Sequence, residues 1–265
     1  MKKSLTLLAL VCLTLAAWAT DLVIEQTDGT TIRINTSGIK RMSFAEPSQE
    51  TQTDWTYESL LAHWALNGDT FDYSGKGRNA TNAGANPCAG INGKDGWAMG
   101  FKGNAANGDE GGHILLPHLN LAEYKQLTIS LWVKEKGMEN LDGEAYIFFG
   151  DHFEGCLGIA HFYNKIEFLA NENTIQIPYR QEYTDNWVHY ALTLKNGTIS
   201  GYINGQLVGS QAHALRVAGN NAALGRHWWG KTSTSTRFTG CIDEVRIYSR
   251  ALSPEELTAL SKAGR

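Results

Sequence analysis

After its first twenty residues the sequence contains no long apolar run. A membrane-spanning helix needs about 20 consecutive apolar residues, so we expect no membrane span in the rest of the chain. An excess of positive charge is also missing, because 23 lysines and arginines stand against 27 aspartates and glutamates, a net charge of −4. Proteins that bind nucleic acid usually present a basic face to the phosphates. The composition therefore argues against a nucleic-acid partner.

Two catalytic patterns are missing as well. The eight histidines do not include the His-Glu-x-x-His spacing that places two metal ligands on one helix face. The Gly-x-Ser-x-Gly elbow, which exposes a nucleophilic serine at a sharp turn, does not occur either. These absences disfavour a zinc protease and a serine hydrolase.

What the N-terminus does contain is the pattern of a signal peptide over residues 1–19. Lys2 and Lys3 precede an apolar segment at 5–15, and Ala-Trp-Ala at 17–19 offers a cleavage site. We therefore expect an exported bacterial protein, located in the periplasm, at the cell surface or outside the cell. Cleavage would remove two lysines and no acidic residue, which makes the mature chain more acidic.

Cleavage would also leave three of the four cysteines, namely Cys88, Cys156 and Cys241. An exported chain can oxidise its thiols, but three cannot all pair within one chain. Cys156 precedes an apolar run and Cys241 opens the last predicted strand. We predict a disulfide between Cys156 and Cys241, with three unpaired buried thiols as the alternative.

Residues 20–44 form a small unit of their own. Two runs of alternating apolar and polar residues surround Thr-Asp-Gly at 27–29, which predicts a β-hairpin. Because two strands alone are marginally stable in water, this hairpin should lean on the main domain or on another chain. Residues 45–58 are polar and predict a linker.

Residues 59–265 show an all-β pattern. In the run at 127–133 the apolar residues Leu127, Ile129, Leu131 and Val133 alternate with others, which predicts a strand with these four on one face. The clearest part is a meander over 187–210, whose turns are the Asn-Gly pairs at 196–197 and 204–205. A helix is predicted only at 253–261, where a serine N-cap, a proline and a glutamate form a capping box. Many short strands without strand–helix alternation predict an antiparallel β-sandwich with one short C-terminal helix.

Four motifs, in this order, resemble the laminin-G-like domains of the concanavalin A-like jelly-roll family. They are Leu61-Ala-His-Trp-Ala-Leu66 with Asp72-Tyr-Ser-Gly-Lys-Gly77; Leu127-Thr-Ile-Ser-Leu-Trp-Val133; Trp187-Val-His-Tyr-Ala-Leu192 with Tyr202-Ile-Asn-Gly205; and Arg237-Phe-Thr-Gly-Cys-Ile-Asp-Glu-Val-Arg-Ile-Tyr-Ser-Arg-Ala-Leu-Ser-Pro-Glu-Glu-Leu257. The resemblance covers about residues 60–258 and implies a jelly roll. It does not specify a ligand, because this fold serves many binders and some enzymes.

The resemblance also implies a calcium site. In such domains a D-x-S-G-x-G loop often approaches the start of the closing strand and holds Ca²⁺, which takes about six to eight oxygen ligands. The predicted ligands are Asp72, Gly77, Asn79 and Asp243. Lys76 and Arg78 place two cations in this loop and depart from the pattern. The alternative is a turn in which the carboxylate of Asp72 only accepts backbone N–H bonds.

The predicted ligand-binding residues are Arg226, His227, Trp228 and Trp229, in a loop between two strands. Adjacent tryptophans in a loop cannot both face one core layer, so at least one should be exposed or covered only by another loop. An aromatic ring beside cationic and polar groups suits the apolar face and the hydroxyls of a sugar. The alternative is that one tryptophan packs beneath its own loop as a lid.

A catalytic carboxylate pair is not evident. Laminarinase-like enzymes on this fold carry carboxylates along one strand, and the nearest match here, Glu139, Asp142 and Glu144, falls in a predicted loop. Asp243 and Glu244 are adjacent, so a regular pleat would point them to opposite faces.

We therefore predict a non-catalytic recognition module for carbohydrate, with a polysaccharide, a glycan or a cell-surface glycoprotein as its partner and calcium as its cofactor. The alternatives are a glycoside hydrolase or lyase on the same fold, and a structural or adhesive cell-envelope protein that pairs with another chain through its N-terminal hairpin.

Overall fold

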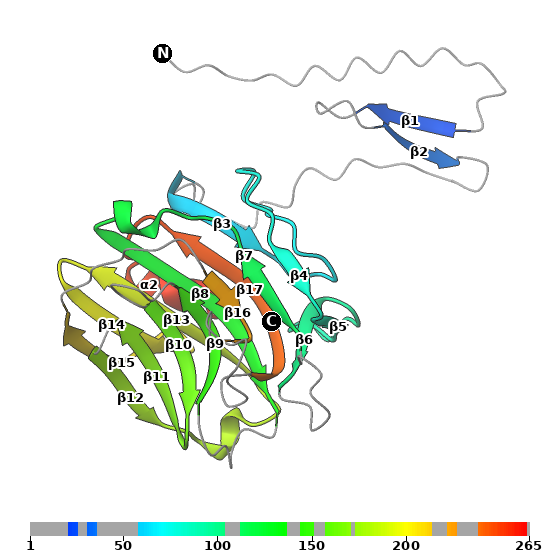
Figure 1. Cartoon of the computed structure of the whole chain (residues 1–265). Helices are drawn as coiled ribbons and strands as arrows, with labels where there is room; N and C mark the ends of the chain where they lie inside the picture. The colour runs from blue at the N-terminus through cyan, green and yellow to red at the C-terminus, as the bar shows by residue number, and fades with distance from the viewer. Residues whose placement is uncertain are drawn as a thin grey trace, which may run out of the picture. The chain divides into compact units, whose positions relative to one another are not determined.

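The computed structural model describes residues 21–25, 31–35, 58–103, 112–136, 144–150, 157–170, 173–213, 222–226 and 238–263 (Figure 1). The chain divides into two units, residues 1–52 and 53–265. In the first unit β1 (Asp21–Glu25) and β2 (Thr31–Asn35) pair antiparallel, as predicted for the hairpin. In the described part of the chain, no helix is long and apolar enough to cross a membrane.

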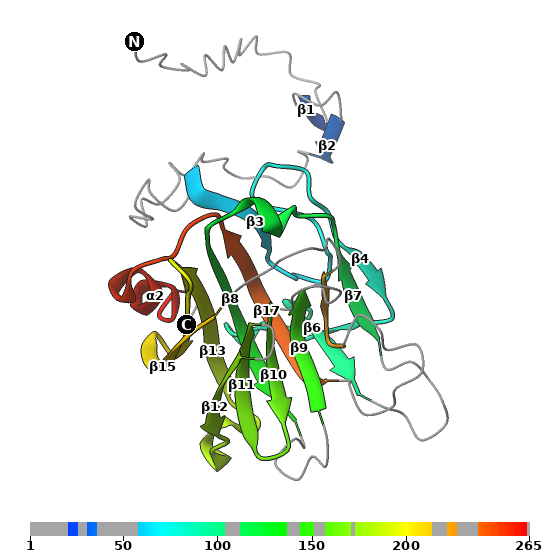
Figure 2. The ribbon, with the colours of Figure 1, turned by 60° about the vertical axis from the view of Figure 1, so that its left-hand side comes forward.

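The second unit is a sandwich of two antiparallel sheets, which confirms the predicted fold class (Figures 1 and 2). The seven-stranded sheet runs in the order β12 (Asn173–Pro178), β11 (Lys165–Ala170), β10 (Leu157–Phe162), β9 (Glu144–Gly150), β16 (Ala222–Leu224), β7 (His113–Leu116), β4 (Thr81–Ala83). The eight-stranded sheet runs β15 (Gln206–Ala212), β14 (Thr198–Ile203), β13 (Trp187–Lys195), β8 (Gln126–Glu135), β17 (Thr239–Tyr248), β6 (Ala98–Lys102), β5 (Asn86–Cys88), and β3 (Leu60–Trp64) pairs with β17. Short 3₁₀ turns occur at Leu121–Glu123 and Gln181–Tyr183.

The core lies between the two sheets and follows the two-residue period of the strands. Leu127, Ile129, Leu131 and Val133 of β8 are all fully buried, so the prediction that they share one face is confirmed. Close contact between the sheets depends on small residues: a Cβ atom added at Gly201 of β14 would lie 2.5 Å from the ring of Phe168.

Both predicted Asn-Gly turns are present. Asn196 and Gly197 have φ angles of 51° and 73°, and Asn204 and Gly205 have φ angles of 51° and 78°. Two consecutive positive φ angles define the turn whose twist matches a hairpin. The turns set the register of β13, β14 and β15.

Helix α2 (Pro254–Leu260) packs on the outer face of the eight-stranded sheet, where β15 is its neighbour (Figure 2). The predicted capping box is confirmed, since the side chain of Ser253 accepts a hydrogen bond from the backbone of Glu256 and the Glu256 side chain accepts one from the backbone of Ser253. Leucines of the helix join a second buried cluster with Tyr202 and Tyr248. The helix therefore closes one part of this outer face.

The predicted Cys156–Cys241 disulfide is wrong, because Cys241 is bonded to Cys88. Cys88 on β5 and Cys241 on β17 flank the same strand, β6, where Cys241 is aligned with Gly100 and Cys88 with Ala98. A Cβ atom at Gly100 would lie only 3.4 Å from the Cβ atom of Cys88, so a glycine leaves room for the bridge to cross β6. Cys156 lies outside the described residues.

Candidate functional site

The closing strand β17 contains a β-bulge at Asp243 and Glu244. Asp243 pairs with Trp132 and Arg246 with Ser130, so three steps on β17 match two on β8, and Glu244 has a φ of 52°. A bulge inserts one residue and re-aims the side chains around it. The expectation that Asp243 and Glu244 point to opposite faces is therefore wrong, since Glu244 reaches residues aligned on the same outer face as Asp243.

Glu244 is neutralised by its neighbours. It forms an ion pair with Arg246 of the same strand, and its Oε2 atom lies 2.8 Å from Nε2 of His63. Burial by itself raises the pKa of Glu244, but the hydrogen bond with His63 and the charge of Arg246 lower it below its ordinary value. Glu244 is consequently a paired anion rather than a proton donor.

Asp243 is in a different state. It is only 4 % exposed, its Oδ2 atom accepts a hydrogen bond from the Ile91 backbone at 3.0 Å, and its Oδ1 atom has no partner. Burial, with the negative charge of Glu244 acting in the same direction, raises the pKa of Asp243 from 3.8 to about 7. A buried carboxylate oxygen without a partner is costly, so Asp243 has capacity for a cation or a proton.

The other predicted calcium ligands lie in the loop around Asp72, which His63 connects to Glu244 through its backbone N–H and its ring. The Asp72 carboxylate accepts hydrogen bonds from the backbone N–H groups of His63, Ser74 and Arg78 and from the Ser74 hydroxyl, at 2.8 to 3.0 Å. Although burial by itself raises its pKa, these hydrogen bonds lower the pKa of Asp72 below its ordinary value. Asn79 in turn accepts the backbone N–H of Asp72.

The Asp72 carboxylate therefore accepts backbone N–H groups, which is the alternative that the sequence left open. Where the structure describes the chain, no three histidine, cysteine or acidic side chains cluster in a way that could hold a metal ion. The calcium site over Asp72, Gly77, Asn79 and Asp243 stays a prediction, with Asp243 as the residue whose carboxylate is available.

Replacing Asp72 by alanine should lower the free energy of unfolding by about 3 kcal/mol, because three backbone N–H groups would lose their acceptor at once. Asp72→Asn keeps one acceptor oxygen and should cost about half as much. Urea unfolding at pH 7 measures both variants, with the exposed Asp95→Ala as a control that should change nothing. A loss below about 0.5 kcal/mol for Asp72→Ala would contradict this reading of the turn.

The predicted tryptophan loop is attached to the sandwich at two adjoining points. Arg226 follows β16 and is buried, whereas His227, Trp228 and Trp229 lie outside the described residues. At the loop's ends the Gly225 backbone donates to the carbonyl of Ile147, and the Phe238 backbone donates to the carbonyl of Gly225, both at 3.0 Å. The described residues on either side of 227–237 thus lie next to each other.

A buried polar network lies at the same end of the sandwich, and the sequence analysis missed it. His161 of β10 contacts Glu135 of β8 at 2.7 Å, and its other ring nitrogen donates to the carbonyl of Tyr163 at 2.5 Å. The Tyr190 hydroxyl donates to Glu135 at 3.2 Å. Burial, followed by the charge of Glu135, raises the pKa of Tyr190 well above its ordinary value.

This network connects the two sheets through polar groups that are almost wholly buried. Both ring nitrogens of His161 and both carboxylate oxygens of Glu135 have a hydrogen-bond partner, which suits a structural role in the core. The period of β8 could have revealed it, because Glu135 continues the inward series of 127, 129, 131 and 133.

Exposed aromatic side chains occur on two loops that touch each other. Phe71 and Tyr73 are 58 % and 49 % exposed, and Trp97 is 40 % exposed with the Lys94 ammonium 3.9 Å from its ring centre. The loops meet where a Cβ atom at Gly68 would lie 3.1 Å from the Gly96 carbonyl. These rings carry no recognisable sequence pattern, because their exposure depends on how the two loops pack.

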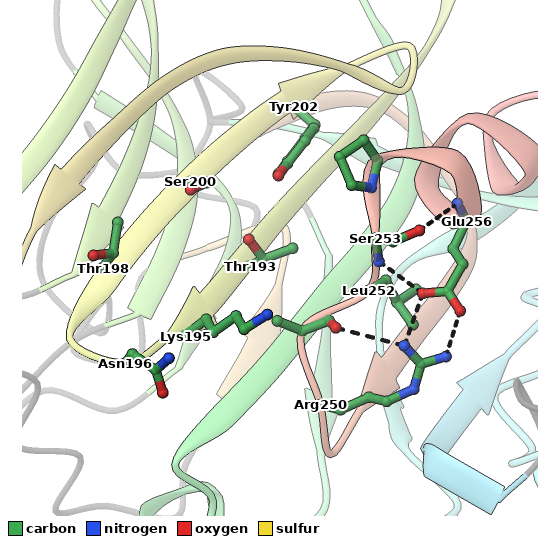
Figure 3. A pocket seen from close by; sticks show the side chains of 12 residues that line it. Thr193, Lys195, Asn196, Thr198, Ser200, Tyr202, Arg250, Leu252, Ser253 and Glu256 are labelled. Atoms are coloured by element: carbon green, nitrogen blue, oxygen red, sulfur yellow. Dashed lines mark hydrogen bonds and ion pairs between the residues drawn. The ribbon is translucent and has the colours of Figure 1, made fainter.

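A groove lies on the outer face of the eight-stranded sheet (Figure 3). Its floor is formed by polar side chains of β13 and β14, and its wall by the chain between β17 and α2. The cavity volume is about 570 Å³. Its lining residues are Thr193, Lys195, Asn196, Thr198, Ser200, Tyr202, Arg250, Ala251, Leu252, Ser253, Pro254 and Glu256.

The fold defines the class of the protein as a jelly-roll domain of the concanavalin A type. A family model described as the concanavalin A-like lectin/glucanases superfamily, of the laminin-G type, matches residues 107–258, more than half of the chain. The chain therefore belongs to the laminin-G-like family of this superfamily, as the sequence motifs indicated. A search of proteins with curated functions gives no significant match.

Solved structures share the fold. One is domain 4 of AbnA, a GH43 extracellular arabinanase from Geobacillus stearothermophilus, in complex with arabinotriose: identity is 26 %, the TM-score 0.61, and the match covers 77 % of this chain and 98 % of that domain. Another is botulinum neurotoxin type C, whose cell entry depends on interaction with two ganglioside molecules: identity is 17 %, the TM-score 0.62, and the match covers 78 % of this chain and 51 % of that one. The chain spans about half the length of the neurotoxin structures, and at this identity they show the fold alone.

Proposed function

We propose that this protein is an exported, non-catalytic recognition module that binds carbohydrate, either as a polysaccharide or as the glycan of a cell-surface glycoprotein. The observation that carries the proposal is the likeness over nearly the whole length of an arabinanase domain that was solved with a bound arabinotriose. The loop that begins after Arg226 supports it, because loops on a rigid sandwich are common positions for recognition residues.

The state of the acidic side chains favours binding over glycoside hydrolysis. A hydrolase needs two carboxyl groups roughly 5–10 Å apart on either side of an open cleft. Among the described residues, Asp72 is saturated by its turn, and Glu135 and Glu244 are paired with histidines. Asp243 lies beneath the backbone of Ile91. Glu139 and Asp142 of the predicted acidic segment lie outside the described residues, whereas Glu144 begins β9 and not a loop, so its placement was predicted wrongly.

Replacing Trp228 by alanine should weaken binding to the polysaccharide about tenfold or more without unfolding the protein, because it removes an aromatic platform for a sugar face. A glycan array that includes arabinan and arabinotriose, followed by calorimetry on the best ligand, measures this effect. Trp97→Ala is the matched control, since Trp97 is exposed on different loops.

If Trp97→Ala abolished binding and Trp228→Ala did not, the recognition surface would be the pair of loops around Trp97. A folded protein that bound no member of the array would contradict the proposed function and shift weight to the adhesive alternative. In that alternative, deletion of residues 20–44 should change the oligomeric state.

We also propose that calcium stabilises the domain through Asp243, whose Oδ1 atom is buried and without a partner. When bound, the ion would neutralise this carboxylate without a proton. Asp72 would contribute only if its turn opened, because its oxygens already accept hydrogen bonds. The measurement that tests this proposal is the pH dependence of stability described in the Discussion.

A further inference from the structure

The groove of Figure 3 lies far along the sheet from Arg226 and Phe238, the described residues on either side of the tryptophan segment. It occupies the Lys195 end of β13, whereas Trp187, at the other end of that strand, pairs with Lys134. Lys134 also pairs with Cys241 near the start of β17, where the segment 227–237 rejoins the sheet. The groove is therefore a separate surface at the opposite end of the eight-stranded sheet.

The floor of the groove is lined by hydroxyl groups. Thr193, Thr198 and Tyr202 line the groove along β13 and β14, as Figure 3 shows, and their hydroxyls make no hydrogen bond among the described residues. Thr193 and Tyr202 are only 5 % and 7 % exposed, so little more than the edge of each side chain reaches the groove. Ser200 lies between them, with its Oγ atom 2.7 Å from that of Ser210. A row of hydroxyls on a regular sheet matches a polyhydroxylated ligand, since each can donate and accept.

The side chains that line the groove carry a net positive charge. The Glu256 carboxylate accepts two hydrogen bonds from the Arg250 guanidinium, at 2.7 and 2.8 Å, and one from the Ser253 backbone at 2.7 Å (Figure 3). This pair cancels. Lys195 makes no ion pair among the described residues, so one ammonium group remains free at the edge of the groove.

We propose that this groove is a second carbohydrate site, selective for acidic oligosaccharides. The Lys195 ammonium pairs with a sugar carboxylate, while the hydroxyls of Thr193, Thr198 and Tyr202 bond to the sugar hydroxyls. The volume of about 570 Å³ lies within the range of roughly 300–1,000 Å³ typical of small-ligand clefts. The inference rests on the proposed carbohydrate-binding function but uses a different surface.

The test is an NMR titration of the full chain with trigalacturonate and, as the neutral counterpart of equal length, galactotriose. We expect trigalacturonate to shift the amide signals of residues 193–200, and to bind about tenfold more tightly than galactotriose. Lys195→Gln should weaken trigalacturonate binding about five- to tenfold, Lys195→Arg should keep it within about threefold, and Lys262→Gln, at an exposed lysine on another element, should not change it. Raising the salt concentration should weaken the wild-type complex and leave the Lys195→Gln complex almost unaffected.

Two results would overturn the acidic-sugar site: equal affinity for both trisaccharides, or an affinity for trigalacturonate that Lys195→Gln leaves unchanged. The same titrations in Trp228→Ala separate the two proposals. If that variant loses arabinotriose binding and keeps the shifts at 193–200, both surfaces bind sugar independently. If no saccharide shifts the amide signals of residues 193–200 while Trp228→Ala loses arabinotriose binding, the groove proposal fails and the proposed function stands. If neither surface responds to any saccharide, both fail.

Discussion

Removing the disulfide between Cys88 and Cys241 should lower the free energy of unfolding by about 5 kcal/mol. The bridge joins residues 153 apart in the sequence, and a closed loop of that length removes much conformational entropy from the unfolded chain. Urea unfolding of Cys88→Ala, with and without a reductant, measures the loss. In the wild type the reductant should produce a similar loss, and in the variant it should produce none.

Cys156→Ala is the matched control, because it separates the observed pairing from the one that the sequence suggested. With Cys88 bonded to Cys241, Cys156→Ala should keep the full effect of the reductant. An insensitive Cys156→Ala protein would instead show that Cys156 carries the disulfide.

In the presence of a chelator, the protein should lose stability as the pH rises from about 4 to about 7, and Asp243→Asn should remove this loss. The pKa of Asp243 is raised from 3.8 to about 7 in the folded protein, so between these values the folded state binds a proton that the unfolded state has released. Stability then falls with increasing pH, by up to about 4 kcal/mol, at about 1.4 kcal/mol for each pKa unit. Above pH 7 the difference between the two proteins should be constant, with Asp243→Asn the more stable.

Thermal and urea unfolding measure the stability of both proteins across this pH range. The difference between the wild type and Asp243→Asn isolates the contribution of this one carboxyl group. A second measurement compares the two proteins with and without calcium. If Asp243 holds the ion, adding calcium at pH 8 should raise the melting temperature of the wild type and leave that of Asp243→Asn unchanged. Parallel pH profiles of the two chelated proteins would contradict the raised pKa, and an equal calcium response in both would remove Asp243 from the calcium proposal.

Features of local origin were predictable from the sequence. The Asn-Gly turns at 196–197 and 204–205, the capping box at Ser253, and the inward face of β8 all depend on residues within a few positions of one another. Because turn type, cap and pleat follow from nearby backbone geometry, these predictions were confirmed. The order of the family motifs extended them to the jelly roll.

The candidate site was less predictable, since it depends on strand register. Regular alternation along β17 predicted that the side chains of Asp243 and Glu244 point to opposite faces of the sheet. The extra residue in the bulge makes that prediction wrong. The same holds for the Glu135–His161 contact, which joins strands of different sheets. A pattern of alternation cannot reveal where a bulge occurs, because the bulge is stabilised by partners on β8 and β3 that lie far away in the sequence.

The sequence by itself thus determined the class of fold, the hairpin turns, the helix cap and the expectation of an exported binding module. Only the tertiary structure decided which cysteine pairs with Cys241, that Asp243 keeps a buried oxygen without a partner, and that Lys195 lies beside a row of free hydroxyls. The physical reason is the range of the interactions. Turns and caps are short-range, whereas a disulfide across β6, an unsatisfied carboxylate and a groove between β14 and the 250–256 segment exist only once distant strands have come together.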